Sequence, residues 1–188
     1  MRALLLLTVL AAACGDNVGS PLDYSNPKGG KLRLIKSTTK PAAETEVVLE
    51  LVVGDQPLTG YSVGFDLPVG HRLVRLVEFT AGTALDPGTS PPAAQGRQPI
   101  DGPLADTLVT GLSQKASGPG AIAIDTTLAP KSVLYTIKLQ LILNAPDGIV
   151  FDGTDPNFHL PSGGMRDRSG TTVVEANEVA IGKLEINR

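Results

Sequence analysis

The 188-residue sequence contains no tryptophan, one cysteine, two histidines and few aromatic residues. A lone cysteine, Cys14, excludes a disulfide bond within the chain. The histidines His71 and His159 lie far apart in the sequence, with no cysteine beside them. Because a zinc site needs three or four such ligands, solvated or hydrogen-bonded histidines are the better interpretation. We expect no metal site, no catalytic residues and no cofactor.

Clusters of basic residues and long apolar runs are also missing. The 16 Lys and Arg residues are scattered among 19 Asp and Glu residues, with a net charge of −3. Nucleic-acid binding needs clustered Lys and Arg, so a nucleic-acid partner is not expected. Asp, Lys, Glu or Pro interrupts every later apolar segment before it reaches the ~20 residues that cross a bilayer.

The first 13 residues have the layout of a secretory signal peptide. Arg2 precedes an uncharged apolar run that ends in small residues before Cys14. The segment Leu10-Ala11-Ala12-Ala13-Cys14 resembles a bacterial lipobox, in which the cysteine is acylated and becomes the first mature residue. Ala11 departs from the leucine that is most common three residues before that cysteine. An ordinary signal peptidase would cut at the same bond, which leaves an unlipidated secreted protein as the alternative.

Residues 14–30 are expected to form a lipidated, flexible tether. The segment after Cys14 is rich in Gly, Pro, Asn, Asp and Ser, which makes regular structure unfavourable. As a flexible coil it would reach about 20–24 Å from a membrane surface. Residues 31–188 are then expected to form one domain, since a chain of ~150 residues can bury a real core.

The domain shows the pattern of an all-β protein. Apolar and polar residues alternate in short segments separated by Gly, Pro and Asp clusters, which predicts about eight to ten strands. One apolar and one polar face per strand is typical of an antiparallel sandwich or barrel. The predicted strands cover residues 31–36, 46–53, 61–67, 73–79, 108–112, 121–125, 132–143, 171–175 and 179–186.

Two segments fit this pattern poorly. Residues 103–114 carry leucines four apart, as a helix would, but their Thr, Val and Gly residues favour a strand in the second half. Residues 80–103 contain five prolines and four glycines and are predicted to be a long irregular loop. Such loops are either functional or tolerated surface insertions, and both interpretations stay open.

The order of motifs resembles a cohesin domain. The resemblance rests on four segments: Thr59-Gly-Tyr-Ser-Val-Gly-Phe65, the strand ending near Gly82, the long strand Val133-Leu-Tyr-Thr-Ile-Lys-Leu-Gln-Leu141, and a closing pair of segments at 165–173 and 182–186. It covers roughly residues 30–187. It implies a jelly-roll, cohesin-like β-sandwich that binds a protein without catalysis, as cohesins bind dockerins through one sheet face. The related carbohydrate-binding sandwiches are the nearest competitor.

Ser62 lies in a short motif that occurs in hydrolases. Gly60-Tyr61-Ser62-Val63-Gly64 matches the Gly-x-Ser-x-Gly nucleophile elbow, which needs a strand, a strained turn and then a helix. Here the alternation continues through Leu67, and Pro68 follows. A hydrolase that uses Ser62 with His71 or His159 is therefore the least favoured hypothesis.

The segment Asp152-Gly-Thr-Asp155-Pro-Asn157 is acidic and offers oxygen ligands for calcium. Its glycine and oxygen-bearing residues do not have the spacing of an EF-hand loop. Asp-Gly and Asp-Pro-Asn sequences are common in turns, so we favour a turn over a calcium site.

Carbohydrate binding usually needs exposed aromatic rings, and the sequence has few to offer. Tyr61, Phe65 and Tyr135 are predicted to lie on the core face of their strands, which leaves Tyr24 and Phe158 as the candidate sugar platforms. The sequence thus predicts a protein of the bacterial cell envelope, held to a membrane through Cys14. Its sandwich is expected to bind a protein partner, with polysaccharide as the alternative.

Overall fold

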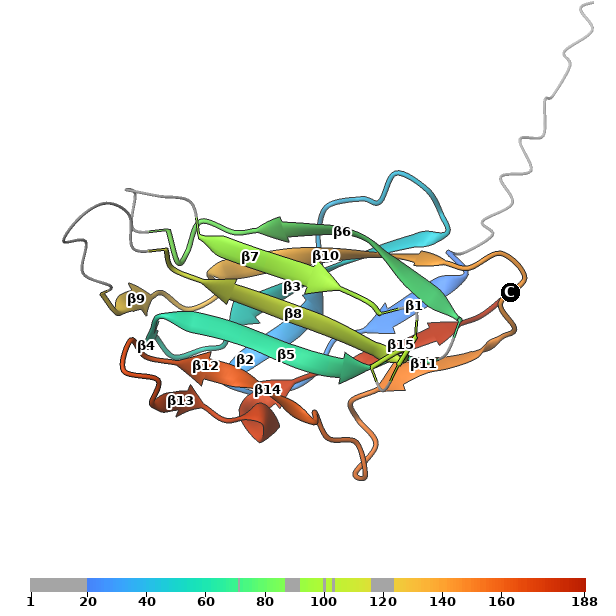
Figure 1. Ribbon diagram of the computed structural model, residues 1–188. Helices are drawn as coiled ribbons and strands as arrows, with labels where there is room; N and C mark the ends of the chain where they lie inside the picture. Colours follow the sequence, from blue (N-terminus) through green and yellow to red (C-terminus); the bar gives the residue numbers. More distant parts are fainter. Residues whose placement is uncertain (1–19, 71, 87–91, 100, 103, 116–123) are drawn as a thin grey trace, which may run out of the picture.

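The computed structural model describes residues 20–70, 72–86, 92–99, 101–102, 104–115 and 124–188 (Figure 1). Over these residues the chain forms fifteen strands and one 3-10 helix. Their bounds are β1 Leu22–Ser25, β2 Leu32–Lys36, β3 Glu46–Val53, β4 Leu58–Gly60, β5 Ser62–Pro68, β6 Val74–Ala81, β7 Ala93–Arg97, β8 Thr107–Ser113, β9 Thr126–Leu128, β10 Val133–Leu141, β11 Gly148–Asp152, β12 Ser162–Arg166, β13 Thr172–Val174, η1 Ala176–Glu178, β14 Val179–Ala180 and β15 Lys183–Ile186.

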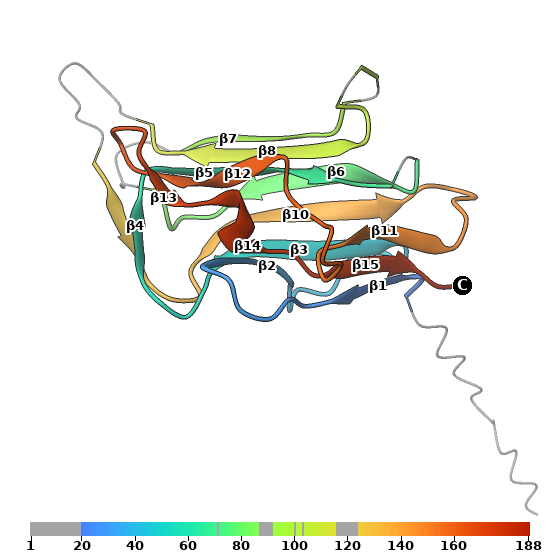
Figure 2. The same ribbon diagram turned by 90° about the horizontal axis from the view of Figure 1, so that it is seen from below.

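The strands form two layers, seen edge-on in Figure 2. One layer contains the sheet β13-β12-β5-β8-β7, called here the β5 sheet, and the other contains the sheet β14-β2-β3-β10-β6, called the β3 sheet. Neighbouring strands run antiparallel except β14 and β2. A three-stranded sheet, β1-β15-β11, and the pair β4-β9 complete the fold. The predicted all-β antiparallel sandwich is confirmed, with more and shorter strands than expected.

The core between the layers follows from the alternation in the sequence. Phe65 of β5 and Tyr135 of β10 are buried from opposite sheets, with ring centroids 6.1 Å apart. The Tyr135 hydroxyl and Thr110 Oγ1 of β8 lie 2.8 Å apart, and Thr110 also bonds the backbone of Phe65. The contact between Thr110 and Tyr135 gives each of their buried hydroxyls a partner. It therefore joins the two layers without leaving either hydroxyl unpaired.

Alkaline conditions should weaken the sandwich through its buried tyrosines. Burial raises the pKa of Tyr24 and of Tyr135 above the usual 10.0. A group whose pKa is raised in the folded state contributes stability below its unfolded pKa and loses that contribution as the pH rises above it. We expect the free energy of unfolding, measured by urea titration, to fall less steeply between about pH 9 and pH 11 in Tyr135→Phe than in the wild type. The control Phe65→Leu, which removes a buried ring from the same core and no ionisable group, should keep the wild-type slope.

The prediction of a flexible tether is wrong for the part of residues 14–30 that the structure describes. Strand β1 pairs with β15, with Leu22 opposite Ile186. Leu22 and Tyr24 are buried. The Tyr24 hydroxyl donates to the Leu34 carbonyl oxygen at 2.6 Å and accepts from the Gly182 N–H at 2.9 Å. Two alternating apolar side chains therefore outweigh the turn-forming residues around them, and the domain begins before residue 31.

The stretch 80–103 is also more ordered than its composition predicts. It contains β7, which pairs with β8 of the β5 sheet. The Gln98 side chain accepts from the Leu76 N–H at 2.9 Å and donates to the Val74 carbonyl oxygen at 3.1 Å. Gln98 thus occupies backbone groups of the edge strand β6. Without it, these groups would be free to pair with a strand of another chain.

The second half of residues 103–114 is a strand, β8, as favoured over a helix. The strand predicted at 121–125 falls partly outside the described residues, and the described residues 124 and 125 are not in a strand. Here β9 follows, at Thr126–Leu128. Strands β4, β7, β11 and β12 were not expected, and they are short or glycine-containing segments that gain their partners only in the folded chain.

Candidate functional site

The outer face of the β5 sheet carries a row of glycines that crosses three strands. Gly164 of β12 lies opposite Gly64 of β5, and Gly64 lies opposite Gly111 of β8. Gln95 of β7 lies opposite Gly111 and ends the row. Because residues opposite one another share a face of the sheet, the row forms a floor of bare backbone, called here the glycine trough.

Two of these glycines have structural reasons to be there. Gly164 has a φ of 114°, which side chains rarely tolerate, and a Cβ atom on it would collide with the Val174 carbonyl oxygen. A Cβ atom on Gly64 would collide with the Thr110 carbonyl oxygen. The close approach of neighbouring backbone thus requires both residues to lack a side chain.

Gly111 has no such reason. A Cβ atom on it would meet nothing within 4 Å, and its φ lies outside the left-handed region. Among the glycines that the structure describes, Gly111 alone combines these two properties. A glycine inside a strand costs about 0.5–1 kcal/mol of stability relative to alanine. A strand glycine that neither sterics nor backbone conformation requires often marks a place where a ligand or another chain approaches closely.

Small and polar side chains border the trough. On one side lie Ser62 and Ser113, with Arg166 at the β12 edge. On the other side Asp66 accepts from the Ser162 hydroxyl at 2.7 Å. The Cα atoms of Ser62 and Asp66, one from each border, are about 13 Å apart along β5, given the rise of a strand. The hollow between them has a volume of about 560 Å³.

The trough offers no aromatic platform. Phe65, which lies beside the hollow, is buried at 2% exposure and belongs to the core. Burial of Phe65 and Tyr135 confirms the core-face prediction for both, whereas Tyr61 is half-exposed. Tyr24 of β1, expected as a possible sugar platform, is buried in the core, so that prediction is wrong.

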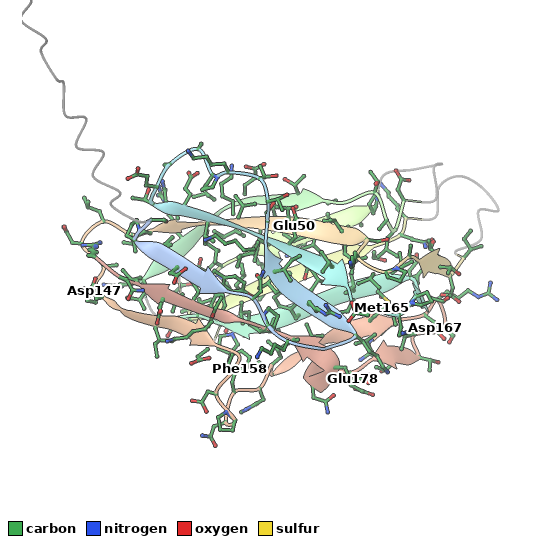
Figure 3. All side chains as sticks on the ribbon, turned by 180° about the vertical axis from the view of Figure 1, so that it is seen from behind. Glu50, Asp147, Phe158, Met165, Asp167 and Glu178 are labelled. Atoms are coloured by element: carbon green, nitrogen blue, oxygen red, sulfur yellow. The ribbon has the colours of Figure 1, made fainter. Side chains whose placement is uncertain are left out.

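A second hollow, of about 950 Å³, is lined in part by Phe158. Figure 3 labels Phe158 in the segment between β11 and β12. Three segments line the hollow, residues 26–30, 153–160 and 175–181. Phe158 is half-buried and packs against the core, and the exposed His159 places Nδ1 3.1 Å from the Asn157 carbonyl oxygen. This hollow therefore holds the remaining candidate platform of the sugar hypothesis.

The acidic segment after β11 forms two successive turns. Asp152 Oδ1 accepts from the N–H and the hydroxyl of Thr154, and these bonds hold the pKa of Asp152 below its usual value. Asp155 Oδ1 accepts from the N–H and the side-chain amide of Asn157. Both carboxylates are thus used within their own turns, as the turn interpretation expects. Across the described residues, no three His, Cys, Asp or Glu side chains are grouped so that they could hold a metal ion.

The nucleophile-elbow geometry is not present at Ser62. This residue begins β5, which continues to Pro68 without a turn into a helix. Ser62 borders the glycine trough, while His159 lines the other hollow. His71 lies outside the described residues, as does Cys14. Within the described ranges no helix is long and apolar enough to cross a membrane.

Comparisons with known proteins find similarity in structure alone. No protein-family model and no curated protein matches the chain. A chain in the crystal structure of a type I cohesin–dockerin complex from Clostridium thermocellum is 12% identical, with a TM-score of 0.44, over 81% of this chain and 95% of that one. The solution structure of CaCohA2 from Clostridium acetobutylicum is 12% identical, with a TM-score of 0.43, over 83% and 92%. The assignment as an antiparallel sandwich rests on the sheets themselves.

Proposed function

We propose that this protein is an exported, lipid-anchored component of the bacterial envelope whose sandwich binds another protein, without catalysis, through the glycine trough. The observation that supports this most directly is Gly111, a glycine that the strand does not need. Its missing side chain costs stability and keeps the floor of the trough open, which favours a role in contact with a partner.

The shape and chemistry of the trough suit a polypeptide. The glycine floor would let a partner's backbone approach closely. Serine hydroxyls along one border and charges at Asp66 and Arg166 supply hydrogen bonds that fix orientation. Binding through one sheet face is also what the sequence resemblance to cohesins implies.

Carbohydrate binding is the second candidate and would use a different place. The hollow beside Phe158 combines a partly exposed ring with the polar side chains of Asn26, Asn177 and Glu175. Because the trough has no exposed aromatic ring while this hollow has one, variants in the two places separate the two functions.

Replacing Gly111 with valine should raise stability and weaken binding. Valine has a much higher strand propensity, and its Cβ meets no atom, so we expect the free energy of unfolding to rise by about 0.5–1 kcal/mol. The side chain would fill the trough floor, and we expect a loss of partner affinity of about tenfold or more. Urea titration measures the first effect, and retention of the partner on immobilised protein measures the second.

The binding test uses residues 20–188 as bait against envelope extract from the source organism, with and without calcium. We expect a saturable protein partner that Gly111→Val loses and that Thr80→Val, on the exposed face of β6, retains. A partner retained equally by both variants contradicts use of the trough. Enrichment of polysaccharide that depends on Phe158 favours the second candidate. Calcium dependence would favour a calcium site at Asp152 and Asp155 over the turn interpretation.

A further inference from the structure

The described part of the chain begins at one end of the sandwich, next to its C-terminal residues. The Ser20 hydroxyl donates to the Glu44 carbonyl oxygen at 2.7 Å, and the Asn187 N–H donates to the Pro21 carbonyl oxygen at 2.9 Å. The chain is therefore fixed to the domain from Ser20 onwards. Figures 1 and 2 show the start of β1, the C-terminal residues and the β10–β11 connection together at this end.

Two large apolar side chains lie exposed at the same end. Leu143, in the β10–β11 connection, is 86% exposed, and Ile149, at the second position of β11, is 54% exposed. Leu143 borders a hollow of about 820 Å³ together with Ser20 and Pro21. Single exposed apolar residues are common on protein surfaces, but these two lie within seven residues of each other and beside the start of the fold.

The length of chain before Ser20 limits where this end can lie. Only residues 15–19 separate Cys14 from Ser20, and six residue steps span about 20 Å at most and about 12–15 Å as a coil. Because β1 belongs to the domain, this link is much shorter than the sequence alone indicated. A lipid on Cys14 would hold the end that carries Leu143 close to the headgroups.

We propose that this end is a membrane seat, in which Leu143 and Ile149 dip into the interface of a phospholipid bilayer beside the anchor. The proposal rests on the lipidation of Cys14 that the proposed function includes. The charges around Leu143 are mixed, with Lys36 and Arg188 beside Asp23 and Glu44, so the contact is apolar and needs no anionic lipid.

The seat also orients the binding face. Strands β5 and β8 lie antiparallel along the long axis of the sandwich, between the end with the seat and the opposite end (Figure 1). The glycine trough crosses these strands on the side of the molecule. A domain seated on this end would therefore hold the β5 sheet parallel to the membrane normal, with the trough facing sideways and open to a neighbouring protein.

The test places a fluorophore at each end of the full-length lipidated chain. Leu143→Cys and Ile149→Cys report the proposed seat. Ile124→Cys is the matched control, since Ile124 is 52% exposed and lies just before β9 at the opposite end. Each protein is labelled with a polarity-sensitive dye and reconstituted into phosphatidylcholine vesicles with or without nitroxide-bearing lipids. We expect a blue-shifted emission at positions 143 and 149, and nitroxide quenching about twofold or more greater than at position 124.

The controls separate failure of the seat from failure of the anchor. In the wild type, a lipidated Cys14 has no free thiol and takes up no dye. Equal quenching at all three positions with Cys14 blocked overturns the seat and leaves the anchor intact. A blue shift at position 143 without nitroxide quenching indicates contact between two copies of the chain and also overturns the seat. Dye uptake by Cys14 in the wild type overturns both proposals.

Discussion

Replacing Tyr24 with alanine is expected to lower the free energy of unfolding by about 3–5 kcal/mol. The ring is buried, with 4% of its surface exposed, and it packs edge-on against Phe151 at 6.1 Å between centroids. Its hydroxyl also joins the Leu34 carbonyl oxygen to the Gly182 N–H. The truncated side chain would leave a cavity between β1, β2 and β15 and two backbone groups without their partner.

Urea titration of three variants separates these contributions. Tyr24→Phe keeps the ring and loses the hydroxyl, so we expect a cost of about 1–3 kcal/mol. Asp23→Ala, at the exposed neighbouring position of the same strand, should change stability by about 0.5 kcal/mol or less. If Tyr24→Ala has no larger effect than Asp23→Ala, then β1 contributes nothing to the domain and the sequence-based tether is the better description.

Replacing Cys14 with alanine is expected to move the exported protein from the membrane fraction to the aqueous phase. Two or three acyl chains anchor a protein stably, whereas the rest of the sequence offers no basic block that would hold it by charge. Phase partition in a detergent that clouds on warming measures the effect, together with the mass of the N-terminal peptide.

The control for the anchor is Leu143→Ser, which alters the proposed seat and keeps Cys14. It should remain in the detergent phase, because partition depends on the acyl chains. A Cys14→Ala protein that still enters the detergent phase contradicts lipidation, and so does an N-terminal peptide of unmodified mass in the wild type.

Much of the fold could be predicted because long strands carry their own pattern. The alternation of β10, with Tyr135, Ile137 and Leu139 facing the core, is explicit in the sequence and appears in the structure as predicted. The same holds for β5, where Val63, Phe65 and Leu67 are buried. In such segments local preference and tertiary burial agree.

The short strands could not be predicted, because pairing partners decide them. Strand β1 has only two inward side chains and lies among residues that favour turns. Strand β12, Ser-Gly-Gly-Met-Arg, has almost no strand propensity of its own and exists because it pairs with β5 and β13. Both depend on partners far away in the sequence.

The glycine trough is a feature of register and was not foreseen. Gly64 stood out in the sequence only as part of a cohesin-like segment and of a hydrolase-like motif, and Gly111 only as a poor helix former. Their relation to Gly164 depends on the pairing of three strands from distant parts of the chain. The signal available beforehand was a glycine in the middle of a predicted strand, at 111, which is unfavourable unless something approaches it.

The central claim is that the outer face of the β5 sheet contacts a protein partner, and site-specific photo-crosslinking tests it most directly. A benzophenone side chain at Gln95, which ends the glycine row, is compared with the same side chain at Thr80, on the outer face of the β3 sheet. In envelope extract we predict a crosslink to one protein from position 95 and none from position 80. The crosslink from position 95 should be lost when the same chain also carries Gly111→Val. A crosslink to the same protein from position 80, with none from position 95, would contradict the account.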